Sequence, residues 1–278
     1  MTERAEKLLV TLEGGVKRIT INRPERRNSV DGETVRLLLA AIRESADDGT
    51  RVVVLTGAGD SFCAGADLAA TSAGDIAGFD VTTSLRENVN PTILAMRTLP
   101  VPIIARVHGH AVGVGFNYAL ACDVIVASEQ ALFGQVFVKI GLMPDGGGTY
   151  FLPRLVGYHK AFELIATGEI IGAQEALQLG IVNKVVPVAE LDATVDAVAA
   201  RFAGSPRVAI AKIKAALNRD ARAELADALD FEAVNQDACF HSPDFVEGVT
   251  AFMQKRKAVF GKAAGEASGE SAREGDAG

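Results

Sequence analysis

Aromatic residues and cysteines are scarce in this chain of 278 residues. It has no tryptophan and only 3 tyrosines, which argues against a surface on which nucleic-acid bases stack. Its 3 cysteines, Cys63, Cys122 and Cys239, are far apart and lack the spacing of metal ligands. This pattern predicts neither a disulfide framework nor a zinc cluster, and it fits a reducing compartment.

An excess of positive charge and long apolar runs are missing as well. The net charge of −7 argues against a partner with a phosphate backbone. No stretch reaches the length of a membrane span without a charge or a glycine, and the first residues lack the apolar core of a signal peptide. We therefore expect a cytoplasmic protein with no nucleic-acid partner and no membrane partner. The 49% of hydrophobic residues suffices for a large core.

The first part of the chain alternates between strand and helix patterns. Residues 8–13 and 16–22 are rich in β-branched residues and are joined by Gly14-Gly15, which predicts a hairpin. Residues 34–45 place apolar side chains on one helical face. Further strands are expected at 51–56, 102–107 and 123–127, and further helices after Leu68, at 116–121 and at 149–155.

The pattern changes beyond Pro187, where strand signals stop and helical periodicity continues to about Phe260. From residue 261 onward, large apolar residues are too few to offset the entropy of ordering. We therefore predict three parts: an α/β core over 1–200, a helical region over 201–260 and a disordered tail over 261–278.

Three glycine-rich turns, at 57–65, 109–115 and 141–148, each follow a strand or apolar segment. Such turns can hold phosphates at helix N-termini. None of them has the P-loop pattern, however, and the first lacks the third glycine of a dinucleotide fingerprint. His108 and His110 lack a third ligand nearby, so no metal site is expected.

Five segments of the chain, taken together and in order, resemble the crotonase superfamily, which contains the enoyl-CoA hydratases and isomerases. The resemblance implies a crotonase-like α/β fold of repeated ββα units in stacked sheets with a C-terminal all-helical region. It also implies a homotrimer or dimer of trimers with the C-terminal helices at the interfaces, an acyl-CoA thioester as ligand, and no cofactor apart from the coenzyme A of the substrate. The segments are INRPERRNSV (21–30), VVVLTGAGDSFCAGADL (52–68), HGHAVGVGFNYALACD (108–123), FGQVFVKIGLMPDGGGTYFLPRLVG (133–157) and FMQKRKAVFG (252–261).

The resemblance further implies an oxyanion hole formed by the backbone N–H groups of Ala66 and Val114. Two fixed amides can stabilise the negative charge that develops on a thioester oxygen. Gly65 and Gly113 would let the backbone approach the ligand closely. Contacts to the acyl-CoA are also implied for Ala64, Asp67 and Leu68, although Asp67 equally fits the first turn of a helix.

Two positions depart from the hydratases of this superfamily. The sites that match their two glutamates are Asn117 and Phe137. Neither an amide nor a phenyl ring transfers a proton near neutral pH, so hydration by two glutamates is in doubt. Asn117 remains a catalytic-site position and Phe137 a ligand contact.

Asp145, in the string GLMPDGGG, is the carboxyl that remains well placed to transfer a proton. This string resembles the ring-epoxide and double-bond isomerases of phenylacetyl-CoA breakdown and related enoyl-CoA isomerases, in which an acidic residue at this turn carries a proton. A 1,3-shift needs one such group. The alternative is that Asp145 caps the helix that begins near Gly147.

The matching segments also place Arg26, Arg27 and Lys255 as candidates for contacts to the phosphates of coenzyme A, and Phe252 for packing against it. Each charged residue could equally be a solvated surface side chain. The favoured function is isomerisation of an enoyl-CoA. Enoyl-CoA hydratase is the alternative within the same class, and a non-catalytic acyl-CoA binding protein is the alternative of another class.

Overall fold

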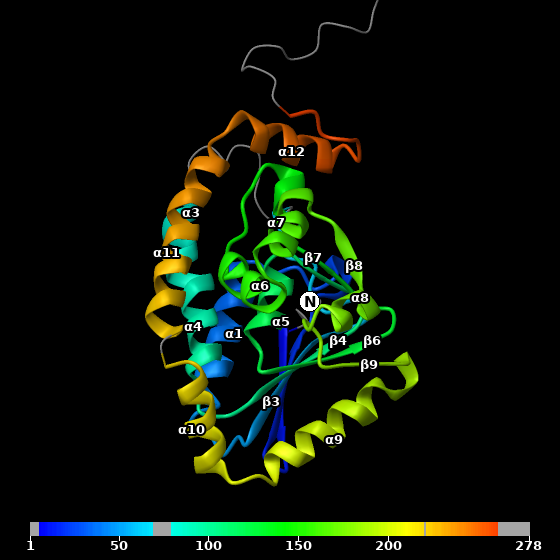
Figure 1. Ribbon diagram of the computed structural model, residues 1–278, viewed down its shortest axis with the longest axis vertical. Coiled ribbons are helices and arrows are strands. Elements are labelled where there is room, and N and C mark those ends of the chain that lie inside the picture. Colours follow the sequence, from blue (N-terminus) through cyan, green and yellow to red (C-terminus); the bar gives the residue numbers. More distant parts are fainter. Residues whose placement is uncertain (1–5, 69–78, 220, 261–278) are drawn as a thin grey trace, which may run out of the picture.

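The fold is built on a six-stranded sheet at the centre of the computed structural model, which describes residues 6–68, 79–219 and 221–260. The strand order is β1-β2-β3-β4-β6-β9 (Figure 1). β1 and β2 are antiparallel, and every other neighbouring pair is parallel. The strands are β1 (Leu8–Glu13), β2 (Val16–Ile21), β3 (Val52–Gly57), β4 (Ile103–Val107), β6 (Val124–Ser128) and β9 (Lys184–Val186).

A smaller sheet carries one side of the site. Its three strands run in the order β5-β7-β8 and are β5 (His110–Val112), β7 (Leu132–Gly134) and β8 (Ile170–Gly172). β5 follows β4 of the large sheet through Gly109, whose φ of 55° suits glycine, and β7 follows β6 of the large sheet. The two sheets and their helices confirm the mixed α/β class.

The predicted hairpin and first helix are both confirmed. Gly14 and Gly15 have positive φ at the turn between β1 and β2. Helix α1 (Gly32–Glu44) begins two residues earlier than the apolar pattern indicated. The reason is Asp31, whose carboxylate accepts a hydrogen bond from the Thr34 N–H at 2.9 Å and so caps the helix.

The apolar run of β3 is explained by helices on both faces of the large sheet. Val52 and Val54 pack against helix α9 (Leu191–Ala203). Val53 and Leu55, which alternate with them, belong to the main core. That core also holds side chains of α1 and α4 (Asn90–Thr98), on the side of the sheet opposite α9 (Figure 1).

The C-terminal part is helical, as predicted. Within the described residues no strand follows β9. The predicted boundary at residue 200 falls inside α9, and the division into domains stays a prediction. The later helices are α10 (Arg207–Leu217), α11 (Ala221–Phe240) and α12 (Pro243–Met253).

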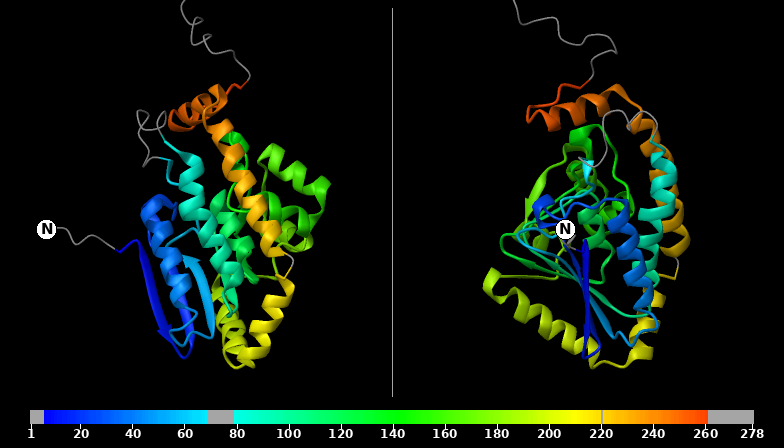
Figure 2. Two further views of the ribbon diagram at one scale, coloured as in Figure 1. Left: turned by 90° about the vertical axis from the view of Figure 1, so that its left-hand side faces the viewer. Right: turned by 180° about the vertical axis from the view of Figure 1, so that it is seen from behind.

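Helix α11 lies along a helical stretch that was not predicted from the sequence (Figure 2). This stretch consists of α3 (Val81–Ser84), η3 (Leu85–Val89) and α4. The predicted helix after Leu68 and the predicted disordered tail lie outside the described residues. None of the helices found in the described ranges is both long and apolar enough to cross a membrane.

The remaining elements connect the sheets and surround the site. Helices α5 and α6 begin at two of the glycine-rich turns identified in the sequence. The elements are η1 (Pro24–Arg26), α5 (Val114–Ala121), η4 (Val136–Ile140), α6 (Gly148–Val156), α7 (Tyr158–Thr167), α8 (Ala173–Gln178) and η5 (Val188–Glu190).

Candidate active site

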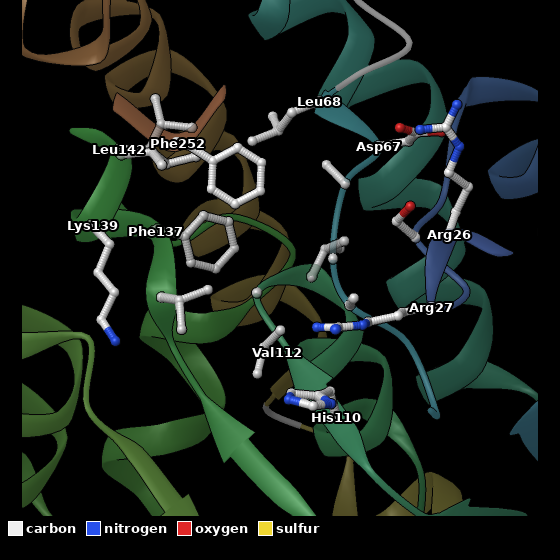
Figure 3. Close-up of a pocket in the computed structure, with 18 of the residues that line it drawn as sticks. Arg26, Arg27, Asp67, Leu68, His110, Val112, Phe137, Lys139, Leu142 and Phe252 are labelled. Atoms are coloured by element: carbon white, nitrogen blue, oxygen red, sulfur yellow. The ribbon is translucent and has the colours of Figure 1, made fainter. Parts of the chain in front are cut away.

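A cavity of about 610 Å³ brings together most of the residues singled out in the sequence. Of the predicted site residues, all line it except Asn117 and Lys255. Figure 3 shows Phe137 and Phe252 on one side of the cavity and Arg26 and Arg27 on the other. The lining residues that the predictions did not include are Glu25, Ser29, His110, Val112, Val136, Lys139, Ile140, Leu142 and Ile170.

The two glycine turns of the expected oxyanion hole lie side by side. The Cys63 N–H donates to the carbonyl of His110 at 2.9 Å, and the Val112 N–H donates to the carbonyl of Cys63 at 3.1 Å. A Cβ at Gly65 would lie 3.2 Å from the carbonyl oxygen of Val112, and the φ of Gly65 is 97°. This close approach of two backbone segments therefore requires glycine.

Two backbone donors at these turns are available to a ligand. Val114 is the first residue of α5, after an N-cap glycine, so its N–H has no acceptor inside the helix. Among the described residues, no acceptor pairs with the N–H of Ala66 or of Val114. Both residues line the cavity, so both N–H groups remain candidates for the oxyanion hole that the sequence predicts.

Asp67 supports the first of these turns. Its side chain is only 6% exposed and forms an ion pair with Arg23 at 2.6 Å. Its N–H donates to the carbonyl of Val30 at 2.9 Å, and the Val30 N–H donates to the carbonyl of Gly65 at 2.8 Å. Arg23 had no role in the sequence predictions, although it stands in the first matching segment.

Asp145 reaches the cavity from the turn before α6. Its Oδ2 accepts a hydrogen bond from Nε2 of Gln236 at 3.2 Å. Its Oδ1 is buried and has no hydrogen-bond partner among the described residues. A carboxyl with so few donors around it is poorly stabilised as an anion.

Asp145 does not cap α6, so the capping alternative is wrong. The N-cap residue is Gly147, and no side chain from the turn itself caps the helix. The amides at this helix start are instead held by Glu232 of α11, which accepts hydrogen bonds from the N–H of Gly147 at 2.7 Å and of Thr149 at 2.9 Å. The donors that would have bound Asp145 are therefore occupied.

The environment of Asp145 changes its acidity strongly. Burial, together with the negative charge of Glu232, raises the pKa of Asp145 to about 7, and the hydrogen bond from Gln236 opposes this shift. A carboxyl that titrates near neutral pH can accept and return a proton with little free-energy penalty in either direction. This property is typical of proton-transfer sites.

Asn117 lies behind the turn and does not line the cavity. Its Nδ2 donates to the backbone carbonyl of Asp145 at 2.6 Å, and its Oδ1 accepts from Nε2 of Gln135 at 2.6 Å. The side chain is fully buried. Asn117 therefore holds the Asp145 backbone in place, a contact that the sequence did not reveal.

Glu232 and Gln236, which support the turn of Asp145, were also not predicted from the sequence. A signal for both exists in the helical pattern, because they follow Leu225 and Leu229 on the same face of α11. Charged or amide side chains at positions that should face the core indicate a specific polar partner.

Arg26 and Arg27 line the wall of the cavity on the side opposite Phe137 and Phe252 (Figure 3). Phe252 lines the cavity although the residue is 60% exposed. Lys255 follows α12 and does not reach the cavity of this chain. The positive charges of Arg26 and Arg27 suit the phosphates of a ligand, whereas Phe137, Leu142 and Phe252 provide an apolar wall.

The raised pKa of Asp145 predicts a pH-dependent effect on stability. Because the folded state binds this proton more tightly than the unfolded state, where the ordinary pKa is 3.8, the stabilising contribution is complete below pH 3.8 and is lost as the pH rises through about 7. The difference of about 3 corresponds to an upper bound of roughly 4 kcal/mol. Asp145→Asn should therefore raise the thermal midpoint of unfolding more at pH 8 than at pH 5. A gain that is larger at pH 5 would contradict the assignment.

Comparisons with known proteins give one consistent result. A family model described as enoyl-CoA hydratase/isomerase matches residues 11–263. The chain is 39% identical over 246 residues to a probable enoyl-CoA hydratase of Rhodobacter capsulatus, covering 88% of this chain and 94% of the relative. It is 36% identical over 257 residues to the 1,2-epoxyphenylacetyl-CoA isomerase of Escherichia coli, covering 92% and 98%. A crystal structure of an enoyl-CoA hydratase from Mycobacterium avium subsp. paratuberculosis matches 93% of this chain and 100% of that chain, with a TM-score of 0.84 and 40% identity.

Proposed function

Because the chain belongs to the enoyl-CoA hydratase/isomerase family, we propose that it binds an enoyl-CoA thioester and shifts its double bond through Asp145. The observation that carries this proposal is a single desolvated carboxyl in the wall of the cavity, with a pKa of about 7. Of the other acids that line the cavity, Asp67 is paired with Arg23 and Glu25 is exposed to solvent.

The proposed reaction is a 1,3 proton transfer. The carboxylate of Asp145 removes a proton from the carbon alpha to the thioester of a 3-enoyl-CoA, and the electrons move into a dienolate. The N–H groups of Ala66 and Val114 stabilise the charge on the thioester oxygen, each contributing about 3 kcal/mol to lowering the barrier. Asp145 then returns the proton to the gamma carbon, which gives the 2-enoyl-CoA and restores the carboxylate.

Hydration is the second candidate, because relatives such as that of Rhodobacter capsulatus are named enoyl-CoA hydratases. Adding water requires a base for the water and an acid for the alpha carbon. In this chain Asp145 would have to serve as both, since Phe137 is apolar and Asn117 is fully engaged with Asp145 and Gln135. Turnover of matched 2-enoyl-CoA and 3-enoyl-CoA thioesters separates the two reactions, and binding without turnover identifies an acyl-CoA binding protein.

Recognition of the thioester predicts a clear order of affinities. A short acyl-CoA should bind at least about tenfold more tightly than the free acid, because only the thioester carries both the coenzyme A that Arg26 and Arg27 can contact and the oxygen that suits the two amides. Calorimetry with butyryl-CoA, coenzyme A and butyrate measures this order. Equal affinity for all three would contradict the proposed site.

The assembly that we propose is a homotrimer or a dimer of trimers. Large apolar side chains are exposed on several helices of a single chain, which supports further association. Light scattering of the full chain measures the number of subunits. The most exposed of these side chains include Tyr158, Phe162, Val208, Leu217, Phe231 and Met253.

We propose a cytoplasmic location on the composition of the sequence alone.

A further inference from the structure

Helix α11 holds both ends of the turn that carries Asp145. Glu232 and Gln236 lie one helical turn apart on the same face, and both are buried. Gln236 binds the start of the turn: its Oε1 accepts from the Met143 N–H at 3.1 Å, and its Nε2 donates to the Met143 carbonyl at 2.8 Å. Glu232 binds the end of the turn through the amides of Gly147 and Thr149.

The two buried carboxyls differ in the donors that surround them. Glu232 accepts hydrogen bonds from two backbone amides and from the hydroxyl of Thr149, all at the N-terminus of α6. Asp145 accepts one, from Gln236. Donors and the positive end of a helix dipole both favour the ionised form. When the pair shares one proton, that proton therefore resides on Asp145.

We propose that Glu232 is a positioning residue for proton transfer: it fixes the turn that carries Asp145, and its negative charge favours the protonated side chain of Asp145. The inference rests on the proposed function, in which Asp145 carries the proton. It extends that function by naming a charged group that, in addition to burial, keeps part of the Asp145 side chains protonated at neutral pH.

The groups packed around Asp145 support this role for the charge of Glu232. From α5, Asn117 contacts the backbone of Asp145, and Tyr118 is a buried phenol whose pKa is raised well above its ordinary value by burial and by neighbouring negative charges. From α11 come Glu232 and the neutral Gln236. In the part of the chain that the structure describes, no cation acts on Asp145, so the charge of Glu232 is not cancelled there.

The test is the pH dependence of kcat/KM for Glu232→Gln, measured with the substrate that the native protein turns over. Removal of the charge should move the acid limb of the profile to lower pH by roughly 1 pH unit or more, while the affinity for butyryl-CoA stays within about threefold. A lower plateau with an unmoved acid limb would show that Glu232 is only structural and would overturn the inference.

Thr149→Val is the matched control. It removes one hydrogen bond to Glu232 but leaves the charge in place. Its acid limb should therefore coincide with that of the native protein, even if its stability falls. A limb that moves equally in both variants would also overturn the inference, because the hydrogen bond and not the charge would then be responsible.

A second measurement applies if Glu232→Gln does not fold. Carbon-13 NMR of the side-chain carboxyls follows Asp145 and Glu232 in the native protein. Because the shared proton resides on Asp145, Glu232 should ionise at lower pH than Asp145, so that its charge is present while Asp145 titrates. A Glu232 that stays protonated while Asp145 ionises would refute the inference. Failure of the proposed function can be told apart from failure of this inference. If Asp145 is not the proton shuttle, Asp145→Asn retains native turnover, regardless of the result for Glu232.

Discussion

Asp145→Asn should lower isomerase turnover by roughly a factor of 100 to 10,000, while the affinity for acyl-CoA changes by less than about threefold. The amide can still accept the hydrogen bond from Gln236, so the geometry of the turn is preserved. What is lost is the group that titrates near neutral pH. Steady-state kinetics with a 3-enoyl-CoA, paired with calorimetry, measures both quantities.

The matched control for this prediction is Asp227→Asn, which makes the same chemical change on the exposed side of α11. This variant should keep native turnover. If Asp145→Asn retained native turnover on every accepted substrate, the proton shuttle would be wrong, and the reaction would require another base.

Val114→Pro is expected to reduce turnover by roughly 100-fold to 1,000-fold, because it removes one of the two proposed oxyanion donors. Backbone donors can rarely be deleted by mutation. Here Val114 is the first residue of α5, a position that accommodates proline well because its N–H is not used inside the helix. The preceding residue, Gly113, has φ 58° and ψ −134°. This conformation is the mirror image of the extended conformation that residues before proline prefer. Glycine adopts either conformation freely, so Gly113 is compatible with a proline at position 114.

Val114→Ala is the control, because it shortens the side chain but keeps the N–H. It should retain turnover within about tenfold of the native protein, and Val114→Pro should retain the native helical circular dichroism. Equal turnover in the two variants would show that the Val114 amide does not stabilise the transition state.

The strand and turn elements that position the site could be predicted from local sequence. The run at Val52–Gly57 is apolar throughout because both faces of the strand are covered, by α9 on one side and by the main core on the other. The glycines at 65 and 113 were expected from the family resemblance to let the backbone approach a ligand, and in the structure they also let two backbone segments meet. Both signals depend on neighbours in the chain or on the backbone itself, which is why a single sequence reveals them.

The support of Asp145 could not be predicted in the same way. Glu232 lies 87 positions after Asp145 in the sequence, and nothing local to either residue indicates their proximity. Sequence reasoning instead paired Asp145 with the nearest free amides and considered it as a helix cap. In the structure those amides belong to Glu232. The helical stretch at 81–98 was not predicted, although Val81, Leu85, Ile93 and Met96 recur at helical spacing and are buried in the structure.

The most direct test of the central claim is proton NMR of a 3-enoyl-CoA incubated with the full chain in deuterium oxide. We predict conversion to the 2-enoyl-CoA, with part of the product retaining the substrate's own proton at the gamma carbon, since one carboxyl removes and returns it. Formation of a 3-hydroxyacyl-CoA from the matched 2-enoyl-CoA, without any movement of the double bond in the 3-enoyl-CoA, would contradict the account.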